Sequence, residues 1–202
     1  EAYGADLATA RRVTVLVGDL RHGIDDLTHL RRAAQNLLVT VNRPDHAVVV
    51  WAGYEGPTGP AAVMTPARAR VAGAELAAFA RTLDRAVRAD THTTLAVVGN
   101  DAARVAQQAG RHGAEFHNTL LIGTSLGVPG RNVFVLYGDA DLAAHAHLPG
   151  GDPNRPGIVR LAAGDARGQR DYFTPGSEQL SVIARVVSGE GTLPTVTRTG
   201  PE

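Results

Sequence analysis

The residues Thr93-Thr-Leu-Ala-Val-Val98 followed by Gly99-Asn-Asp-Ala-Ala103 form the stretch that decides the fold. The β-branched and apolar residues of the first part predict a buried strand, and the alanine-rich residues 102–113 predict a helix that ends on glycine. A chain that passes from a buried strand through a glycine turn into a helix is typical of α/β proteins, where such a turn presents a side chain at the edge of a sheet. The side chain expected at the tip of this turn is that of Asp101.

Strands and helices alternate on both sides of this stretch. Apolar runs predict further strands at residues 12–18, 46–52, 118–123, 132–137 and 158–162. Apolar residues at helical spacing predict further helices at residues 24–39, 67–89 and 175–188. Because the strands are apolar on both faces and alternate with helices, a mainly parallel sheet between two helical layers is expected. Functional side chains then belong on the loops at the carboxyl ends of the strands, at residues 18–23, 53–60, 99–101, 123–130 and 138–141.

Length and composition suit one domain, which we place at residues 1–190 of the 202. Residues 191–202, rich in threonine, proline and glycine, are expected to form a flexible tail. The core must be aliphatic, since 44% of the residues are hydrophobic but only 4% are aromatic. All 20 basic residues are arginine, which together with abundant alanine is typical of GC-rich genomes such as those of actinobacteria.

The composition argues against several classes of function. Charges of both signs are interspersed and sum to zero, so nucleic-acid binding has little support. The lack of cysteine excludes thiolate catalysis, disulfides and cysteine-ligated metals. The apolar runs are far shorter than the roughly 20 residues of a membrane-spanning helix, so no membrane span is expected. No cofactor is predicted, the oligomeric state stays open, and a cytoplasmic location is slightly favoured, although an export signal before Glu1 would escape detection.

Two motifs fail the test of their context. Gly123-Thr-Ser-Leu-Gly127 matches the G-x-S-x-G pattern of a serine nucleophile, but that turn needs a helix directly after the serine. Here glycines and a proline lead straight to the strand expected at residue 132, so Ser125 is interpreted as an ordinary loop residue. A second group of residues has metal-binding side chains, but its spacing is not diagnostic and no metal site is predicted; its members are Asp139, Asp141, His145 and His147.

Several segments, in this order and spacing, resemble an actinobacterial α/β-hydrolase family catalogued as a domain of unknown function. The resemblance extends from about Val13 to Gly189 and is carried by Trp51-Ala-Gly-Tyr-Glu-Gly-Pro57, Ala72-Gly-Ala-Glu-Leu-Ala-Ala-Phe79, Gly138-Asp139, Gly151-Asp-Pro153 and Asp171-Tyr-Phe-Thr-Pro-Gly-Ser177. It implies a three-layer α/β-hydrolase-like fold with a minimal cap domain or none. It also implies a Ser-His-Asp triad and an oxyanion loop after the first strand.

The chain departs from the family pattern at the positions that perform the chemistry. The family's turn reads Gly-His-Ser-Tyr-Gly-Ser, whereas this chain has Gly99-Asn-Asp-Ala-Ala-Arg104. The segment that carries the base reads Gly-His-Ser-x-Tyr in the family and Gly168-Gln-Arg-Asp-Tyr172 here, so Gln169 replaces the histidine. The resemblance retains only the acid, Asp139. Since glutamine cannot accept and return a proton near neutral pH, this degenerate triad argues against a conventional serine hydrolase.

These substitutions define the candidate site. The catalytic positions implied by the resemblance are Asp101, Asp139 and Gln169. Contacts to a ligand are expected from the loop after the first strand and from the turn before the central helix, namely Asp19, Leu20, Arg21, His22, Asn100 and Ala102. A purely structural interpretation of Asp101 is also open, in which its carboxylate caps a helix that begins at Ala102.

Three hypotheses about function follow. In the first, the protein has lost hydrolysis and binds a small, largely apolar molecule, on which Asp101 could catalyse a proton transfer in a cyclisation, elimination or isomerisation. In the second, Asp101 is the nucleophile of a hydrolase, which requires another histidine, such as His22 or His145, to activate water. In the third, the protein is a non-catalytic pseudoenzyme that acts through a protein partner.

Overall fold

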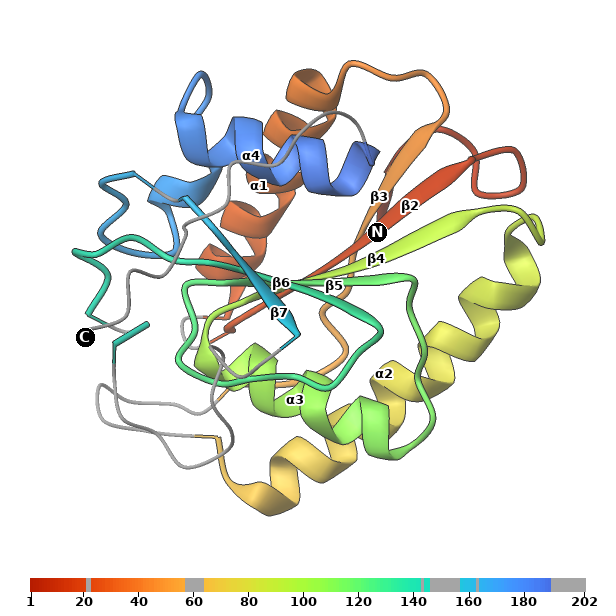
Figure 1. The fold of residues 1–202 in the computed structure, drawn as a ribbon. Helices are drawn as coiled ribbons and strands as arrows, with labels where there is room; N and C mark the ends of the chain where they lie inside the picture. The colour runs from red at the N-terminus through yellow and green to blue at the C-terminus, as the bar shows by residue number, and fades with distance from the viewer. Residues whose placement is uncertain (21–22, 57–63, 143, 146–156, 163, 190–202) are drawn as a thin grey trace.

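A seven-stranded sheet forms the centre of the computed structural model, which describes residues 1–20, 23–56, 64–142, 144–145, 157–162 and 164–189 (Figure 1). The strands are β1 (Ala2–Gly4), β2 (Arg12–Gly18), β3 (His46–Val50), β4 (His92–Val98), β5 (Asn118–Ile122), β6 (Asn132–Leu136) and β7 (Ile158–Leu161). Their order across the sheet is β1-β3-β2-β4-β5-β6-β7. All neighbouring pairs are parallel except β1 and β3. The expected mainly parallel sheet is therefore confirmed.

Helices cover both faces of the sheet. In Figure 1, α1 (Ile24–Val41) and α4 (Glu178–Ser188) lie on one side, and α2 (Pro66–Ala86) and α3 (Asn100–Arg111) lie on the other. Each face has its own core of buried aliphatic side chains, such as Leu37 and Leu180 on the first side and Leu76 and Val105 on the second. The molecule is thus the three-layer arrangement expected from the sequence, and its described part carries no lid.

The helix ends follow the local sequence. Thr65 caps α2 by accepting a hydrogen bond from the N–H of Arg68, and Pro66 occupies its first turn. Ser177 caps α4 in the same way through the N–H of Leu180, so this helix begins after the expected start at residue 175, which precedes the cap. A short 3-10 helix, η1 (Asp171–Phe173), precedes it.

The sheet has a switch point between β2 and β4. The chain moves from β2 to β3 on one side and later returns to place β4 on the other side of β2. The two strands are in register to their last residues, where Gly18 pairs with Val98. In open parallel sheets the crevice at such a point, outside the carboxyl ends of the strands, is the usual place for a ligand. A ligand site is therefore expected beside the loops that follow Gly18 and Val98.

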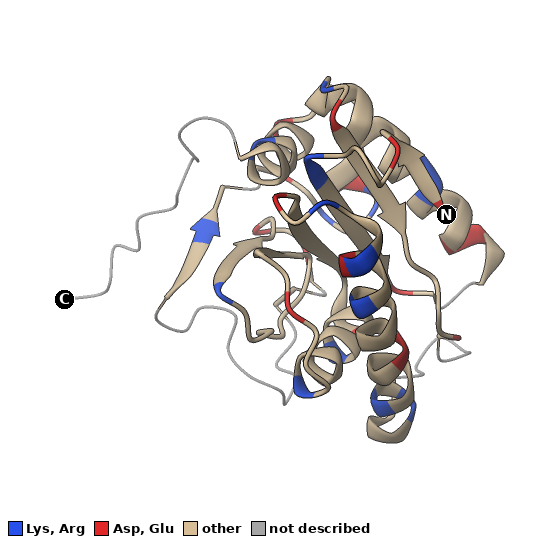
Figure 2. Cartoon of the chain, turned by 90° about the vertical axis from the view of Figure 1, so that its right-hand side faces the viewer, with Lys and Arg blue, Asp and Glu red and all other residues tan. Residues whose placement is uncertain are grey.

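Basic and acidic residues are interspersed in the view of Figure 2, and neither sign gathers on one helix. Among the described helices, none is both long and apolar enough to cross a membrane. The tail expected at residues 191–202 lies outside the described residues.

Candidate functional site

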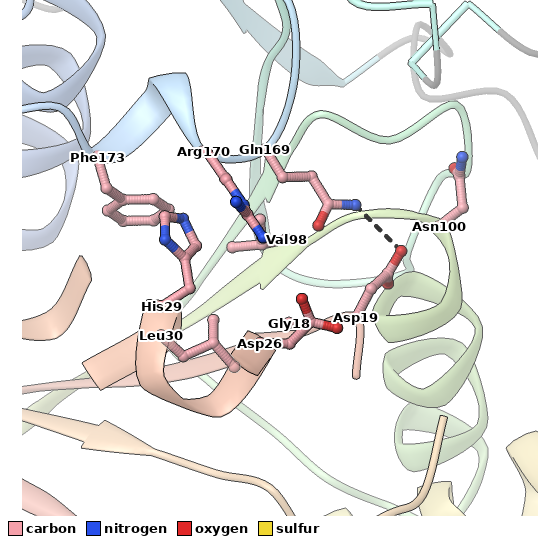
Figure 3. Close-up of a pocket in the computed structure, with 10 residues that line it drawn as sticks. All are labelled: Gly18, Asp19, Asp26, His29, Leu30, Val98, Asn100, Gln169, Arg170 and Phe173. Carbon is pink, nitrogen blue, oxygen red and sulfur yellow. Dashed lines mark hydrogen bonds between the residues drawn. The ribbon is translucent and has the colours of Figure 1, made fainter. Parts of the chain in front are cut away.

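A cavity of about 330 Å³ lies at the switch point (Figure 3). We call it the β2–β4 cavity. Its lining comes from the ends of the two strands, the first two turns of α1, the first turn of α3, and η1 with the two residues before it. The lining residues are Gly18, Asp19, Asp26, His29, Leu30, Val98, Asn100, Gln169, Arg170 and Phe173. Three of the residues expected at the site, Asp19, Asn100 and Gln169, thus meet in one place.

Asp19 links three separate segments of the chain at this place. It directly follows β2, and its buried carboxylate receives two hydrogen bonds from distant parts of the chain. Oδ1 accepts the N–H of Ala102, in the first turn of α3, at 2.8 Å, and Oδ2 accepts Nε2 of Gln169 at 3.0 Å. A carboxylate at a helix N-terminus satisfies a free amide and interacts favourably with the helix dipole. Asp19 therefore caps α3 from another loop and holds Gln169 over it.

The turn between β4 and α3 presents no side chain to the cavity. Gly99 adopts φ +91°, a conformation that favours glycine, and it is the N-cap of α3. A Cβ atom at this position would lie 2.5 Å from Oδ2 of Asp19 and would overlap Nε2 of Gln169. The hydrogen-bonded pair of Asp19 and Gln169 thus fills the space into which a side chain on this turn would project.

Asp101 does not lie at the tip of the turn. The helix begins at Asn100, two residues earlier than expected, because the strand ends at Val98 and the turn is made by Gly99 alone. The interpretation of Asp101 as the N-cap is therefore wrong. Its fully buried carboxylate accepts the N–H of Met64 at 3.2 Å, and Asp101 is not among the described residues that line the β2–β4 cavity.

Asn100 holds the loop that follows β5. Its Oδ1 accepts hydrogen bonds from the hydroxyl of Thr124 at 2.8 Å and from the N–H and hydroxyl of Ser125 at 2.9 and 3.2 Å. Residues 123–131 are all described and contain no helix, as the sequence indicated. Ser125 therefore lacks the helix N-terminus that a serine nucleophile requires.

Of the two acids after β6, the one implied by the resemblance is not the buried one. Asp139 is exposed and forms an ion pair with Arg160 at 3.4 Å, so the structure does not bring it to Gln169. Asp141 is buried instead, and its Oδ2 accepts the hydroxyl of Tyr172 at 2.7 Å. That hydroxyl also accepts the N–H of Gly138. Burial and the bond to Asp141 raise the pKa of Tyr172 above its usual value, which keeps the phenol protonated as the donor.

The remaining expected residues are distributed around the cavity or outside it. Leu20 is buried against the start of α1, where it lines a separate hollow with Ile24 and Leu27. Ala102 contributes only its N–H, to Asp19. Nε2 of His145 lies 3.2 Å from the carbonyl oxygen of Gly138. Three further expected residues lie outside the described part of the chain, namely Arg21, His22 and His147. The described residues contain no cluster of three or more potential metal ligands.

Comparison with known proteins agrees with this architecture. The model of an alpha/beta hydrolase family matches residues 1–128. The chain belongs to this alpha/beta hydrolase family. A crystal structure of esterase PE8 is similar with a TM-score of 0.55 and 17% identity, covering 94% of this chain and 97% of that one. XC6422 from Xanthomonas campestris, an α/β serine hydrolase without a lid, has a TM-score of 0.52 and 16% identity, with 90% and 82% covered. No curated protein matches the sequence.

Among the titratable and aromatic side chains that line the cavity, four were not predicted from the sequence: Asp26, His29, Arg170 and Phe173. Asp26 and His29 are three residues apart in α1, so they lie on one face of that helix. His29 directly precedes Leu30, which is buried, and therefore borders the apolar face. Asp26 and His29 could have been identified from this position: they are two titratable side chains at the border of the apolar face of the helix that follows the loop after β2.

The geometry limits the chemistry available at the turn. A hydrolytic triad needs a nucleophile, a base that takes its proton and an acid that orients the base. Here the side chains that meet beside Gly99 are a carboxylate and a carboxamide, Asp19 and Gln169. The carboxamide can donate a hydrogen bond but cannot exchange a proton near neutral pH.

Proposed function

We propose that this alpha/beta hydrolase family member binds a small molecule in the β2–β4 cavity and does not hydrolyse esters through a serine. The observation that carries the proposal is the contact of Asp19 and Gln169 beside Gly99. It fills the space in front of the turn, and the carboxylate takes the N–H of Ala102, which would otherwise face a substrate oxygen. A negatively charged reaction intermediate would meet a negative charge at that place.

The lining suggests a ligand with an apolar body and a polar end. Leu30, Val98 and Phe173 offer apolar contacts, whereas the amides of Asn100 and Gln169 offer hydrogen bonds. A cavity of about 330 Å³ is within the range of sites for small molecules. The predicted proton transfer by Asp101 is not included in this proposal, because its carboxylate binds the amide of Met64 and lies outside the cavity lining.

The test has a catalytic arm and a binding arm. In the first, the protein is incubated with p-nitrophenyl acetate, p-nitrophenyl butyrate and a fluorophosphonate probe; we expect no protein-dependent hydrolysis and no covalent adduct by mass spectrometry. In the second, ligand-observed NMR screens a library of small aromatic and aliphatic fragments. We expect hits that are lost when Val98→Phe fills the cavity and retained in Val39→Phe, since Val39 is 79% exposed on α1.

Each alternative has its own outcome. Ester hydrolysis that disappears in Asp101→Asn or Ser125→Ala, with an unchanged circular dichroism spectrum, would contradict the proposal and support a hydrolase. Fragments that bind equally to the wild type and to Val98→Phe would show that the β2–β4 cavity is not the site. A complete lack of fragment binding would favour the third hypothesis, a pseudoenzyme that acts through a protein partner.

A further inference from the structure

Two opposite charges line the β2–β4 cavity. Asp26 is half-buried in the first turn of α1, and Arg170 is exposed directly before η1. Figure 3 shows that the two side chains enter the cavity from different walls. Both act on the pKa of His29, which burial lowers most, the positive charge of Arg170 lowers further and the negative charge of Asp26 raises. The two charges therefore lie near the same ring.

The imidazole of His29 is part of the wall and not a contact for a ligand. Its Nε2 atom is shielded from solvent, so a molecule in the cavity does not reach that nitrogen. The polar side chains that a ligand can contact are those that line the cavity and keep exposed surface, namely Asp26, Gln169 and Arg170. These three side chains therefore determine which charges a ligand can carry.

Arg170 provides a site for an anion. Its guanidinium forms no hydrogen bond and no ion pair with another described residue. A guanidinium presents paired N–H donors whose geometry matches that of a carboxylate. A carboxylate on the ligand would therefore give Arg170 the partner that the described part of the chain does not provide.

The other polar groups of the lining favour a cation. Asp26 contributes a negative charge, and Nε2 of Gln169 donates to Asp19, so Oε1 of the same amide is the atom that can accept an N–H from a ligand. Asp19 adds a second, buried carboxylate. A purely anionic ligand would be repelled by these two carboxylates, and a purely cationic one by the guanidinium of Arg170. A ligand that carries both charges meets a group of opposite sign at each end.

We propose that the β2–β4 cavity binds a zwitterion, an α-amino acid with an apolar side chain, whose carboxylate pairs with Arg170 and whose ammonium group pairs with Asp26. This inference rests on the proposed function, because it uses the same cavity. Leu30, Val98 and Phe173 supply the apolar wall for the ligand's side chain. A volume of about 330 Å³ is at the small end of the range for ligand sites, which suits a molecule of this size.

Three compounds with the same phenylethyl skeleton separate the two charges. L-phenylalanine carries both groups, 2-phenylethylamine carries only the ammonium group, and 3-phenylpropionate carries only the carboxylate. Their dissociation constants at pH 7 are measured from the NMR shifts of the backbone amides of Gly18 and Val98, which line the cavity. We expect L-phenylalanine to bind about tenfold more tightly than either of the other two, since it alone makes both charged contacts.

Two variants remove the contacts one at a time. Arg170→Gln should weaken L-phenylalanine and 3-phenylpropionate by about tenfold and leave 2-phenylethylamine as tight as before or tighter. Asp26→Asn should weaken L-phenylalanine and 2-phenylethylamine by a similar factor and leave 3-phenylpropionate as tight or tighter. Because each variant must lose two compounds and retain the third, a loss of folded protein cannot imitate this pattern.

The matched controls remove the same charges from exposed neighbouring positions. Arg167→Gln changes the segment that carries Arg170, and Asp25→Asn changes the residue directly before Asp26; neither position lines the cavity. Both controls should leave all three dissociation constants within about twofold, since solvent screens such charges. If the controls act as strongly as Arg170→Gln and Asp26→Asn, the general charge of the surface determines binding and the two assigned contacts are wrong.

The remaining outcomes separate this inference from the proposed function. If 2-phenylethylamine or 3-phenylpropionate binds as tightly as L-phenylalanine, the cavity recognises a single charge and the zwitterion is wrong. If none of the three compounds binds while the fragment hits that Val98→Phe removes persist, the zwitterion is wrong and the proposed binding function stands. If the fragments themselves bind equally to the wild type and Val98→Phe, both the proposed function and this inference fail.

Discussion

At the scale of single residues, His46 shows how burial fixes a protonation state. It is fully buried at the start of β3, and its Nε2 lies 3.0 Å from the hydroxyl of Thr14 on β2. Burial lowers its pKa to about 4, and the charge of Arg12 acts in the same direction. The folded protein therefore holds this imidazole neutral at pH values where the unfolded chain already binds a proton.

The consequence for stability has a definite sign. Between pH 6.5 and about 4 the unfolded chain binds more protons at His46 than the folded one, so the free energy of unfolding falls as the pH is lowered through this window. The loss reaches about 3 kcal/mol at the acid end, from a shift of roughly 2.5 pH units at 1.36 kcal/mol each. Urea unfolding of the wild type and His46→Gln at pH 7, 5.5 and 4 measures it. The variant should show a weaker dependence on pH; parallel curves would contradict the prediction.

Residue roles were only partly predictable from the sequence. Asp19, Asn100 and Gln169 line one cavity; the first two were expected there because the carboxyl ends of neighbouring parallel strands meet, and Gln169 because of the family resemblance. Asp139, the acid implied by the resemblance, is exposed, whereas Asp141 in the same short loop is buried and bonded to Tyr172, a difference that depends on packing and not on the local sequence. Asp101 was expected at the tip of the turn, but the helix already begins at Asn100, where the N–H of Ala102 is bound by the carboxylate of Asp19, 83 residues earlier in the chain.

At the scale of elements, the contact between α2 and α3 depends on small residues. Gly73 on α2 faces α3 so closely that a Cβ atom there would overlap the Cβ of Gln108 and lie 2.8 Å from the backbone N of Ala109. Gly110 also lies in a helix, α3, but a Cβ there would meet no packed neighbour within 4 Å. The two glycines thus have the same local propensity and opposite surroundings.

This difference predicts opposite effects of one substitution. Gly73→Ala forces the backbones of α2 and α3 apart and should lower the free energy of unfolding by about 1–3 kcal/mol. Gly110→Ala relieves the entropic cost of glycine in a helix and should raise it by about 0.5–1 kcal/mol. Chemical denaturation of both variants beside the wild type gives the two values. Equal effects of the two substitutions would mean that helix propensity, and not the close approach, determines the role of Gly73.

The boundaries of the strands and helices were also only partly predictable from the sequence. The strands and helices of the sheet were found because their apolar residues recur with regular spacing. β1 was missed, since Ala2–Gly4 is too short to show a pattern and is defined only by its antiparallel pairing with β3. The first turn of α3 was missed because Asn100 and Asp101 resemble turn residues, whereas in the structure a carboxylate from another loop satisfies the amide of Ala102.

At the scale of the whole molecule, two cores share one sheet. Val15 and Leu16 are consecutive residues of β2, and they point into opposite cores, Val15 toward α2 and α3 and Leu16 toward α1 and α4. Both cores therefore lose packed side chains when β2, the strand between β3 and β4, unfolds. The sequence predicted one domain over residues 1–190, and this shared sheet is the physical reason to expect that it unfolds as one unit.

A single tryptophan allows this expectation to be tested. Trp51 is the only tryptophan of the chain and packs in the core on the α2 and α3 side. Leu37→Ala creates a cavity in the opposite core and Leu76→Ala creates one in the core that contains Trp51; each should lower the free energy of unfolding by about 2–5 kcal/mol. If the molecule is one cooperative unit, Leu37→Ala shifts the urea midpoint of Trp51 fluorescence as far as that of far-ultraviolet circular dichroism. Val39→Ala, on the exposed side of α1, should shift neither. A fluorescence midpoint that responds to Leu76→Ala but not to Leu37→Ala would show that the two layers unfold independently.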